Sequence, residues 1–134
     1  MKMSASITNR YKFHKADVRT ENITKAMTIE PKSSGFGSSV NGGELLLLAL
    51  ATCFCNDLYR EAQKKNISIE EVKVECIGEF GGEGDAGYNF QYNAEVKSDA
   101  SVDVIEELIK YTDSVAEIQK TLRRGLDIVL TVAK

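Results

Sequence analysis

Alternating hydrophobic and polar positions open the chain. Four apolar residues share one parity: Ala5, Ile7, Tyr11 and Phe13. This two-residue period is typical of a strand with one buried face. Met27–Ile29 is a further short strand candidate, and Pro31 ends regular pairing because proline cannot donate a backbone hydrogen bond. We therefore expect strands over most of the first 30 residues.

A helix is predicted from the next change of pattern. Residues 32–43 are rich in glycine and serine, which indicates a loop. Asn41 and Glu44 then have the spacing of a helix capping box. From Leu45 to Cys55 the pattern is apolar on every side, so this part of the helix is expected to be buried all round. Asn66 is a plausible end of the helix.

Two more alternating segments follow the helix. Apolar positions recur at Val72, Val74, Cys76 and Phe80, and again at Tyr88, Phe90, Tyr92, Ala94 and Val96. The glycine-rich residues 81–85 between them predict a turn, and the whole segment therefore predicts a hairpin.

The remaining residues predict helix and then strand. A helical pattern runs from about residue 101 to residue 124, and we expect a break near Asp113–Ser114 because Ser114 and Glu117 have capping-box spacing. Gly125 would end the helix. Alternating apolar residues then predict a final strand: Leu126, Ile128, Leu130 and Val132. The order of elements indicates an α+β fold in one domain over residues 1–134.

Charge and hydrophobicity narrow the class of protein. The formal net charge of −3 argues against nucleic acid as a partner. The longest apolar run begins at Leu45 and is far shorter than the roughly 20 residues that span a bilayer, so no membrane partner is expected. The N-terminus lacks the apolar segment of a signal peptide, which favours a cytoplasmic protein. The three cysteines are an odd number and do not form a closed disulfide framework.

Cys53, inside the apolar helix, is the main candidate for chemistry. The alternative is that it only packs in the core, because free cysteine is among the most buried residue types. A reactive thiol would need a lowered pKa, supplied by a cation or by hydrogen-bond donors. We interpret Cys55 and Cys76 as core residues. Cys53 and Cys55 lie two apart on the helix, and this pair without a nearby histidine is a poor metal site, so no metal or other cofactor is expected.

The segment from Gly42 to Cys53 resembles the Pro-x-Glu-Leu-Leu-Leu-x-Ala-Leu-x-x-Cys motif of the OsmC/Ohr family, with glycine in place of the proline. These names stand for osmotically inducible protein C and organic hydroperoxide resistance protein. The hairpin and residues 121–126 also match the family's order of elements. The resemblance implies an intertwined homodimer, in which antiparallel sheets wrap around long buried central helices. It also implies thiol-dependent reduction of organic hydroperoxides, a small-molecule substrate class.

The same resemblance assigns roles to particular residues. Cys53 falls on the cysteine that attacks the peroxide, and Glu44 lies at or next to the family's acid. Arg10 is the match for the arginine that activates the thiolate. The family's second cysteine aligns with Ala116, so the resolving thiol is missing. Cys76, a cysteine of the partner chain or an external thiol reductant would then restore oxidised Cys53, and we favour the external thiol.

Two other functions remain open at this point. The chain can be a non-catalytic domain that binds a small apolar ligand, or a structural dimer with inert core cysteines. Titration of reactive thiols separates hydroperoxide reduction from both of these functions. Retention of a ligand in native mass spectrometry separates the ligand-binding domain from the structural dimer.

Overall fold

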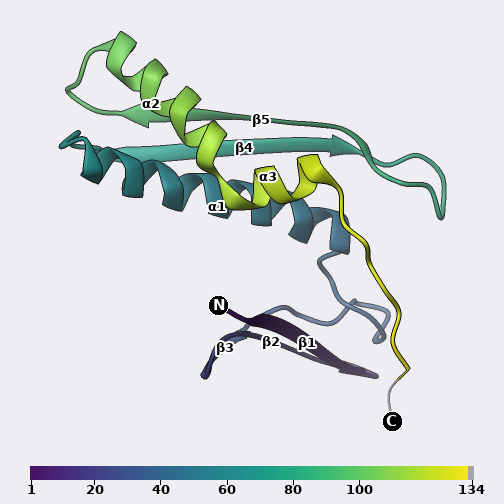
Figure 1. Ribbon diagram of the computed structural model, residues 1–134. Coiled ribbons are helices and arrows are strands. Elements are labelled where there is room, and N and C mark those ends of the chain that lie inside the picture. Colours follow the sequence, from purple (N-terminus) through teal and green to yellow (C-terminus); the bar gives the residue numbers. More distant parts are fainter. Residues whose placement is uncertain (133–134) are drawn as a thin grey trace. The chain divides into compact units, whose positions relative to one another are not determined.

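The computed structural model describes residues 1–132. Contacts divide the chain into two compact units, Met1–Leu45 and Leu46–Lys134, and each is described by itself. The elements, labelled in Figure 1, are β1 (Met3–Arg10), β2 (Phe13–Thr20), β3 (Ile23–Met27), α1 (Gly42–Lys64), β4 (Glu71–Glu79), β5 (Tyr88–Lys97), α2 (Val102–Val115) and α3 (Glu117–Arg124). The α+β class with antiparallel sheets and a long helix is confirmed, and a single domain over 1–134 stays a prediction.

The first unit is an antiparallel sheet in the order β1-β2-β3. Tight turns join the strands, and Lys12 and Glu21 in these turns have φ angles of 56° and 50°. Strands were expected here, but the shared parity of Ala5 to Phe13 does not describe one strand, because the chain turns between β1 and β2. Large apolar side chains remain open to solvent: Ile7 is 59% exposed and Ile23 is 64% exposed. This unit alone supplies no layer that covers them.

Asn9 fixes the glycine-serine loop to the first hairpin. Its side-chain oxygen accepts a hydrogen bond from the Gly37 N–H at 2.9 Å, and its amide donates to the Gly37 carbonyl at 3.2 Å. Gly35 has a φ of 98°, and the ring of Tyr11 packs where a Cβ would stand. Only glycine tolerates both conditions. The loop is therefore held to the sheet through backbone contacts.

The capping box predicted at the start of α1 is confirmed. The Asn41 side chain accepts from the Glu44 N–H at 2.9 Å, and the Glu44 carboxylate accepts from the Asn41 N–H, also at 2.9 Å. The helix ends at Lys64, and Asn66 adopts the left-handed conformation with a φ of 55°. Burial on every side is not found among the described residues, since Leu48 is 54% exposed.

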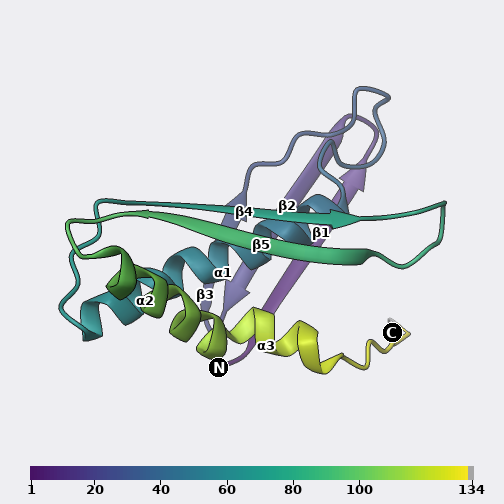
Figure 2. The ribbon, with the colours of Figure 1, turned by 90° about the horizontal axis from the view of Figure 1, so that it is seen from above.

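The second unit packs α1 and α2 on one face of the β4–β5 hairpin (Figures 1 and 2). The inward residues of the strands alternate, as their pattern predicts, and Phe54 meets Tyr92 edge-on at 4.8 Å between ring centroids. The core consists of Phe54, Leu58, Ala62, Leu108 and Ala116, with strand residues such as Val72, Val74 and Ala94 packed against them. The opposite face of the hairpin is open, and Ile77 on it is 61% exposed.

The helical break lies at Ala116, slightly later than predicted. Ser101 caps α2 through its hydroxyl, which accepts from the Val104 N–H at 3.3 Å. The predicted capping box of Ser114 and Glu117 is wrong, because the Ser114 hydroxyl donates to the Tyr111 carbonyl at 2.6 Å instead. Ala116 has a φ of −65° and a ψ of 120°, which separates the two helices. Glu117 is thereby free to point toward α1.

The final strand predicted at residues 126–132 is not formed. Gly125 ends α3 with a φ of 78°, as predicted, and the following residues are extended without strand pairing. Ile128, Leu130 and Val132 are each at least 90% exposed. A strand needs a partner for its hydrogen bonds, and the described residues offer this segment none. The alternating apolar pattern is therefore present without the sheet that it predicts.

Candidate functional site

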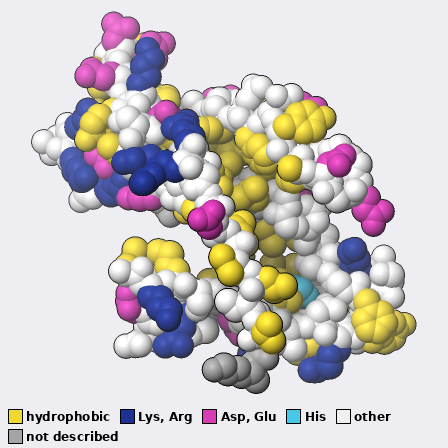
Figure 3. Space-filling view, turned by 45° about the vertical axis from the view of Figure 1, so that its right-hand side comes forward, with side chains coloured by type: hydrophobic (Ala, Val, Ile, Leu, Met, Phe, Trp, Pro, Cys, Tyr) yellow, Lys and Arg dark blue, Asp and Glu magenta, His cyan; other side chains and the backbone are white. Residues whose placement is uncertain are grey.

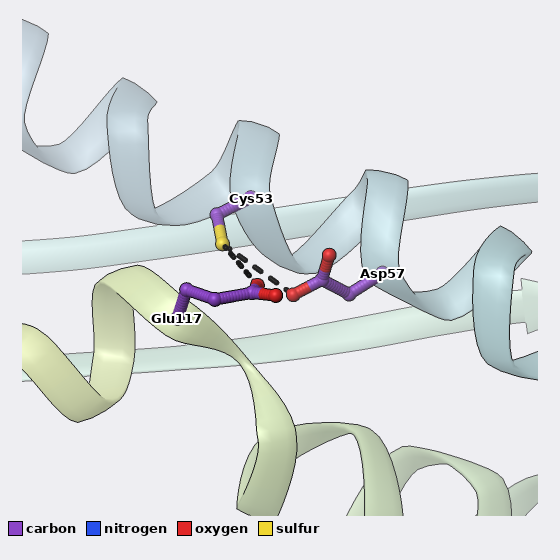
Figure 4. Close-up of side chains that lie close together, drawn as sticks. All are labelled: Cys53, Asp57 and Glu117. Carbon is purple, nitrogen blue, oxygen red and sulfur yellow. Dashed lines mark hydrogen bonds between the residues drawn. The ribbon is translucent and has the colours of Figure 1, made fainter. Parts of the chain in front are cut away.

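Cys53 lies beside two carboxylates in the second unit (Figure 4). Its sulfur is 3.5 Å from Asp57 Oδ2 and 4.0 Å from Glu117 Oε2. Asp57 is one turn further along α1, on the same face as Cys53 because residues four apart on a helix are neighbours. Glu117 is the first residue of α3. The thiol is half-buried, whereas the Asp57 residue is only 5% exposed.

Arg60 joins the acidic groups around the thiol. Its guanidinium contacts Asp57 Oδ1 at 2.9 Å, Glu61 Oε1 at 2.8 Å and Glu117 Oε1 at 3.1 Å. Lys64 adds a second cation to Glu61 at 3.0 Å. Buried carboxylates are stable only when they are paired. This ion-pair cluster therefore accounts for two charged residues, Asp57 and Glu61, on the covered face of α1.

The surroundings disfavour the thiolate form of Cys53. Burial raises the pKa of the Cys53 thiol, and the Asp57 and Glu117 carboxylates raise it further, while the backbone of Ile118 acts in the opposite direction. Burial and the neighbouring Glu117 also raise the pKa of Asp57, although Arg60 opposes this. An attacking cysteine was expected to have a lowered pKa. Within this unit the cations bind the carboxylates, and the pKa of Cys53 is raised instead.

The carboxylate oxygens of Asp57 and Glu117 and the sulfur of Cys53 all lie within 4.8 Å of one another. A thiolate with two carboxylates could in principle bind a divalent cation. The guanidinium of Arg60 already forms ion pairs with both carboxylates, however. These contacts explain the cluster without a metal ion.

The other predicted site residues lie in the first unit. Glu44 is occupied by the capping box, and the Arg10 guanidinium stacks on the Phe13 ring, 4.0 Å from its centroid. Cys53 belongs to the second unit, and a meeting of Glu44 or Arg10 with Cys53 stays a prediction. Ala116, aligned with the family's second cysteine, is fully buried in the core.

Sequence reasoning missed Asp57 and Glu117 as neighbours of the thiol. A signal existed for Asp57, since an acid four residues after a cysteine on a helix shares its face. Glu117 was instead assigned to a helix cap on the basis of its spacing from Ser114. Only the tertiary packing of α3 on α1 brings it to Cys53.

An apolar cavity of about 350 Å³ lies beside the same helix. It is lined by Leu46, Leu50, Phe90, Tyr92, Gln119 and Leu122, together with Gln91 and Arg123. The hydroxyl of Tyr92 donates to Asp113, which also accepts two hydrogen bonds from Arg123 at 2.7 and 3.2 Å. Burial and this carboxylate raise the pKa of Tyr92, which therefore stays a neutral donor. At this rim of the cavity, the polar groups of Tyr92, Asp113 and Arg123 are thus hydrogen-bonded to one another.

Solved structures share this fold. An OsmC-like protein from Mycoplasma pneumoniae has a TM-score of 0.63 at 20% identity, covering 91% of this chain and 86% of its own. An organic hydroperoxide resistance protein OsmC from Legionella pneumophila gives 0.61 at 16% identity, covering 92% and 90%. A putative organic hydroperoxide resistance protein from Vibrio cholerae O1 biovar eltor, with captopril bound in one active site, gives 0.60 at 17%, covering 95% and 88%.

This chain shares the α+β fold of these solved structures. A model of the family described as OsmC-like protein matches residues 35–131. The chain therefore belongs to the OsmC-like family, as its resemblance to OsmC/Ohr proteins indicated. A search of curated protein sequences found no match. Among the described residues, no helix is both long and apolar enough to cross a membrane.

Proposed function

We propose that this protein reduces organic hydroperoxides through Cys53, with Asp57 as the general base. The observation that carries the proposal is the 3.5 Å contact between the Cys53 sulfur and Asp57 Oδ2. A thiol with a raised pKa needs a base to become a nucleophile, and the buried carboxylate beside it can accept the proton. Membership of the family, whose solved relatives include hydroperoxide resistance proteins, supports this reaction class.

The proton and electron movements can be followed through these two residues. Asp57 removes the thiol proton as the sulfur attacks the terminal oxygen of the hydroperoxide. The sulfur–oxygen bond forms, the O–O bond breaks, and the sulfur is oxidised to a sulfenic acid. The alkoxide leaves and takes the proton from Asp57, which gives the alcohol. The Arg60 guanidinium binds Asp57 Oδ1, and this ion pair keeps Asp57 Oδ2 oriented toward the sulfur.

An external thiol completes the proposed cycle. All three cysteines are free thiols, and Cys76 lies opposite Tyr92 in the hairpin, whereas the Cys53 sulfur contacts Asp57 and Glu117. One external thiol attacks the sulfenic sulfur and releases water, and a second reduces the mixed disulfide. The net reductant is thus two equivalents of a small thiol.

Trapping the oxidised sulfur tests this function. Reduced protein receives one equivalent of cumene hydroperoxide and then dimedone, and peptide mass mapping locates the adduct. We expect an adduct on Cys53 and stoichiometric cumyl alcohol, neither of which should form in Cys53→Ser. Unchanged peroxide and an unmodified Cys53 would contradict the proposal. A disulfide between Cys53 and Cys76 would contradict the external-thiol step.

We also propose that the chain works as a homodimer. Hydrophobic side chains are open to solvent on both units (Figure 3). They include Ile7 and Ile23 in the first unit and Ile128 and Leu130 in the second. Large exposed apolar surfaces commonly mark protein interfaces. A second copy of the chain would cover them with matching apolar residues.

The apolar cavity supports a second candidate function, the binding of a small apolar ligand without catalysis. Its volume of about 350 Å³ lies at the lower end of the roughly 300–1,000 Å³ typical of small-molecule sites. Under this function Cys53 would pack as an inert thiol. Slow alkylation of all three cysteines, together with ligand retention in native mass spectrometry, would favour it over peroxide reduction.

A further inference from the structure

Gln119 gives the apolar cavity a polar feature that the core does not explain. The side chain is only 2% exposed, and its amide Nε2 donates to the Leu50 carbonyl at 3.1 Å. Its oxygen, Oε1, is buried and has no hydrogen-bond partner in the part of the chain that the structure describes. Leaving a buried acceptor unpaired is unfavourable, because the atom has lost its hydrogen bonds to water. Because Gln119 is a lining residue of the cavity, an acceptor of this kind suits a ligand that donates a hydrogen bond.

The hydrogen bond of Nε2 determines which partner Gln119 can accept. Nε2 already donates to the backbone of α1, whereas Oε1 has no donor, so the side-chain atom without any partner is an acceptor that can bind an O–H or N–H donor. A ligand oxygen that carries no hydrogen would leave Oε1 unpaired.

The charges near the cavity favour a neutral ligand. Arg123 is the cationic residue of the lining, and both of its terminal nitrogens are bound to Asp113. The guanidinium is thereby neutralised, and a ligand carboxylate would have to compete with Asp113 for it. The remaining lining is mostly aliphatic or aromatic: Leu46, Leu50, Phe90, Tyr92 and Leu122. These residues suit a hydrocarbon body.

We infer that this cavity binds a neutral amphiphile, an aliphatic chain with a terminal hydroxyl that donates to Gln119 Oε1. The inference rests on the ligand-binding function for the cavity and is independent of the reaction at Cys53. It adds the chemical class of the ligand, because a hydrocarbon without a donor would satisfy the walls of the cavity but not Gln119. Such a ligand would enter with its hydroxyl toward α3.

The first test needs no mutation. Binding of 1-octanol and of its methyl ether to the full chain is measured by ligand-observed NMR titration. The ether keeps the aliphatic chain and the oxygen but lacks the O–H donor. We expect 1-octanol to bind about tenfold more tightly, the value of one net hydrogen bond of about 1–1.5 kcal/mol. Equal affinities would overturn the role of Gln119 while leaving an apolar site, and no binding of either compound would overturn the ligand-binding function as well.

Variants then locate the site. Gln119→Leu removes the acceptor and keeps similar volume, so the preference for 1-octanol over its ether should disappear. Leu46→Trp should fill the cavity and abolish the binding of both compounds. Leu48→Trp is the matched control, since Leu48 is 54% exposed on the same helix and does not line the cavity. Unchanged 1-octanol binding in Leu46→Trp would show that the ligand binds elsewhere.

Discussion

At the scale of single residues, Asp57 should have opposite effects on two reactions of Cys53. Removing its charge in Asp57→Asn lowers the pKa of the thiol, so more thiolate is present and iodoacetamide should react faster at pH 7.5. The same change removes the proposed base, and peroxide reduction should fall by about 10²-fold or more. Stopped-flow peroxide consumption and alkylation kinetics measure the two rates.

Glu117→Gln is the matched control for that variant. It also removes a negative charge near the sulfur but leaves Asp57 in place, so alkylation should accelerate while peroxide reduction is kept. In the native protein the raised pKa means that the thiol keeps its proton to a higher pH. Its alkylation rate should therefore reach half of its maximum only above pH 8.5, about the pKa of a free cysteine. Parallel losses of both rates in Asp57→Asn would instead indicate a structural role for Asp57.

The position of a resolving thiol can be tested at the same scale. Ala116 is fully buried in the core, whereas the next residue, Glu117, faces Cys53. We expect Glu117→Cys to form an intramolecular disulfide with Cys53 after peroxide treatment, and Ala116→Cys to form none. Non-reducing peptide mapping distinguishes these results. A disulfide in Ala116→Cys alone would show that the core, not the carboxylate position, supplies the second sulfur.

At the scale of elements, Glu44 can be assigned to the helix cap or to catalysis. Glutamine also serves in a capping box, so Glu44→Gln should change the free energy of unfolding by less than about 0.5 kcal/mol. Asn41→Ala removes the other half of the box and should cost about 1 kcal/mol. Chemical denaturation measures both. Loss of peroxide reduction in Glu44→Gln at unchanged stability would support the catalytic role that the family resemblance implies.

The elements also show what the sequence could predict. The period-2 pattern of the hairpin, the capping box of Asn41 and Glu44, and Gly125 are local signals, and the structure confirms the elements that they indicate. The same period-2 pattern forms no strand at residues 126–132. The cluster of Asp57, Arg60 and Glu117 depends on how α3 packs on α1, which no local pattern specifies. Ser114 is instructive, because its spacing from Glu117 is that of a cap, yet tertiary contacts place that carboxylate beside the thiol.

At the scale of the whole molecule, the C-terminal segment should control assembly. Ile128 and Leu130 are 91% and 95% exposed. The double variant Ile128→Asp and Leu130→Asp would place two charges in the proposed interface, where unpaired charges are costly. Sedimentation should show the native chain at about twice its mass of 14.8 kDa and the variant as a monomer. Substitution of Lys2, which is also exposed, by Asp controls for added charge and should leave the dimer intact.

The unpaired apolar segment after Gly125 has a consequence for heat resistance. If its partner is a second copy, folding and association are one equilibrium, and the stability of each chain depends on how much of it is present. The melting temperature should then rise with protein concentration across a hundredfold dilution series followed by calorimetry. A melting temperature that stays constant over that range would mean that each chain is stable by itself. Dilution, and not only heat, is thus expected to unfold this protein.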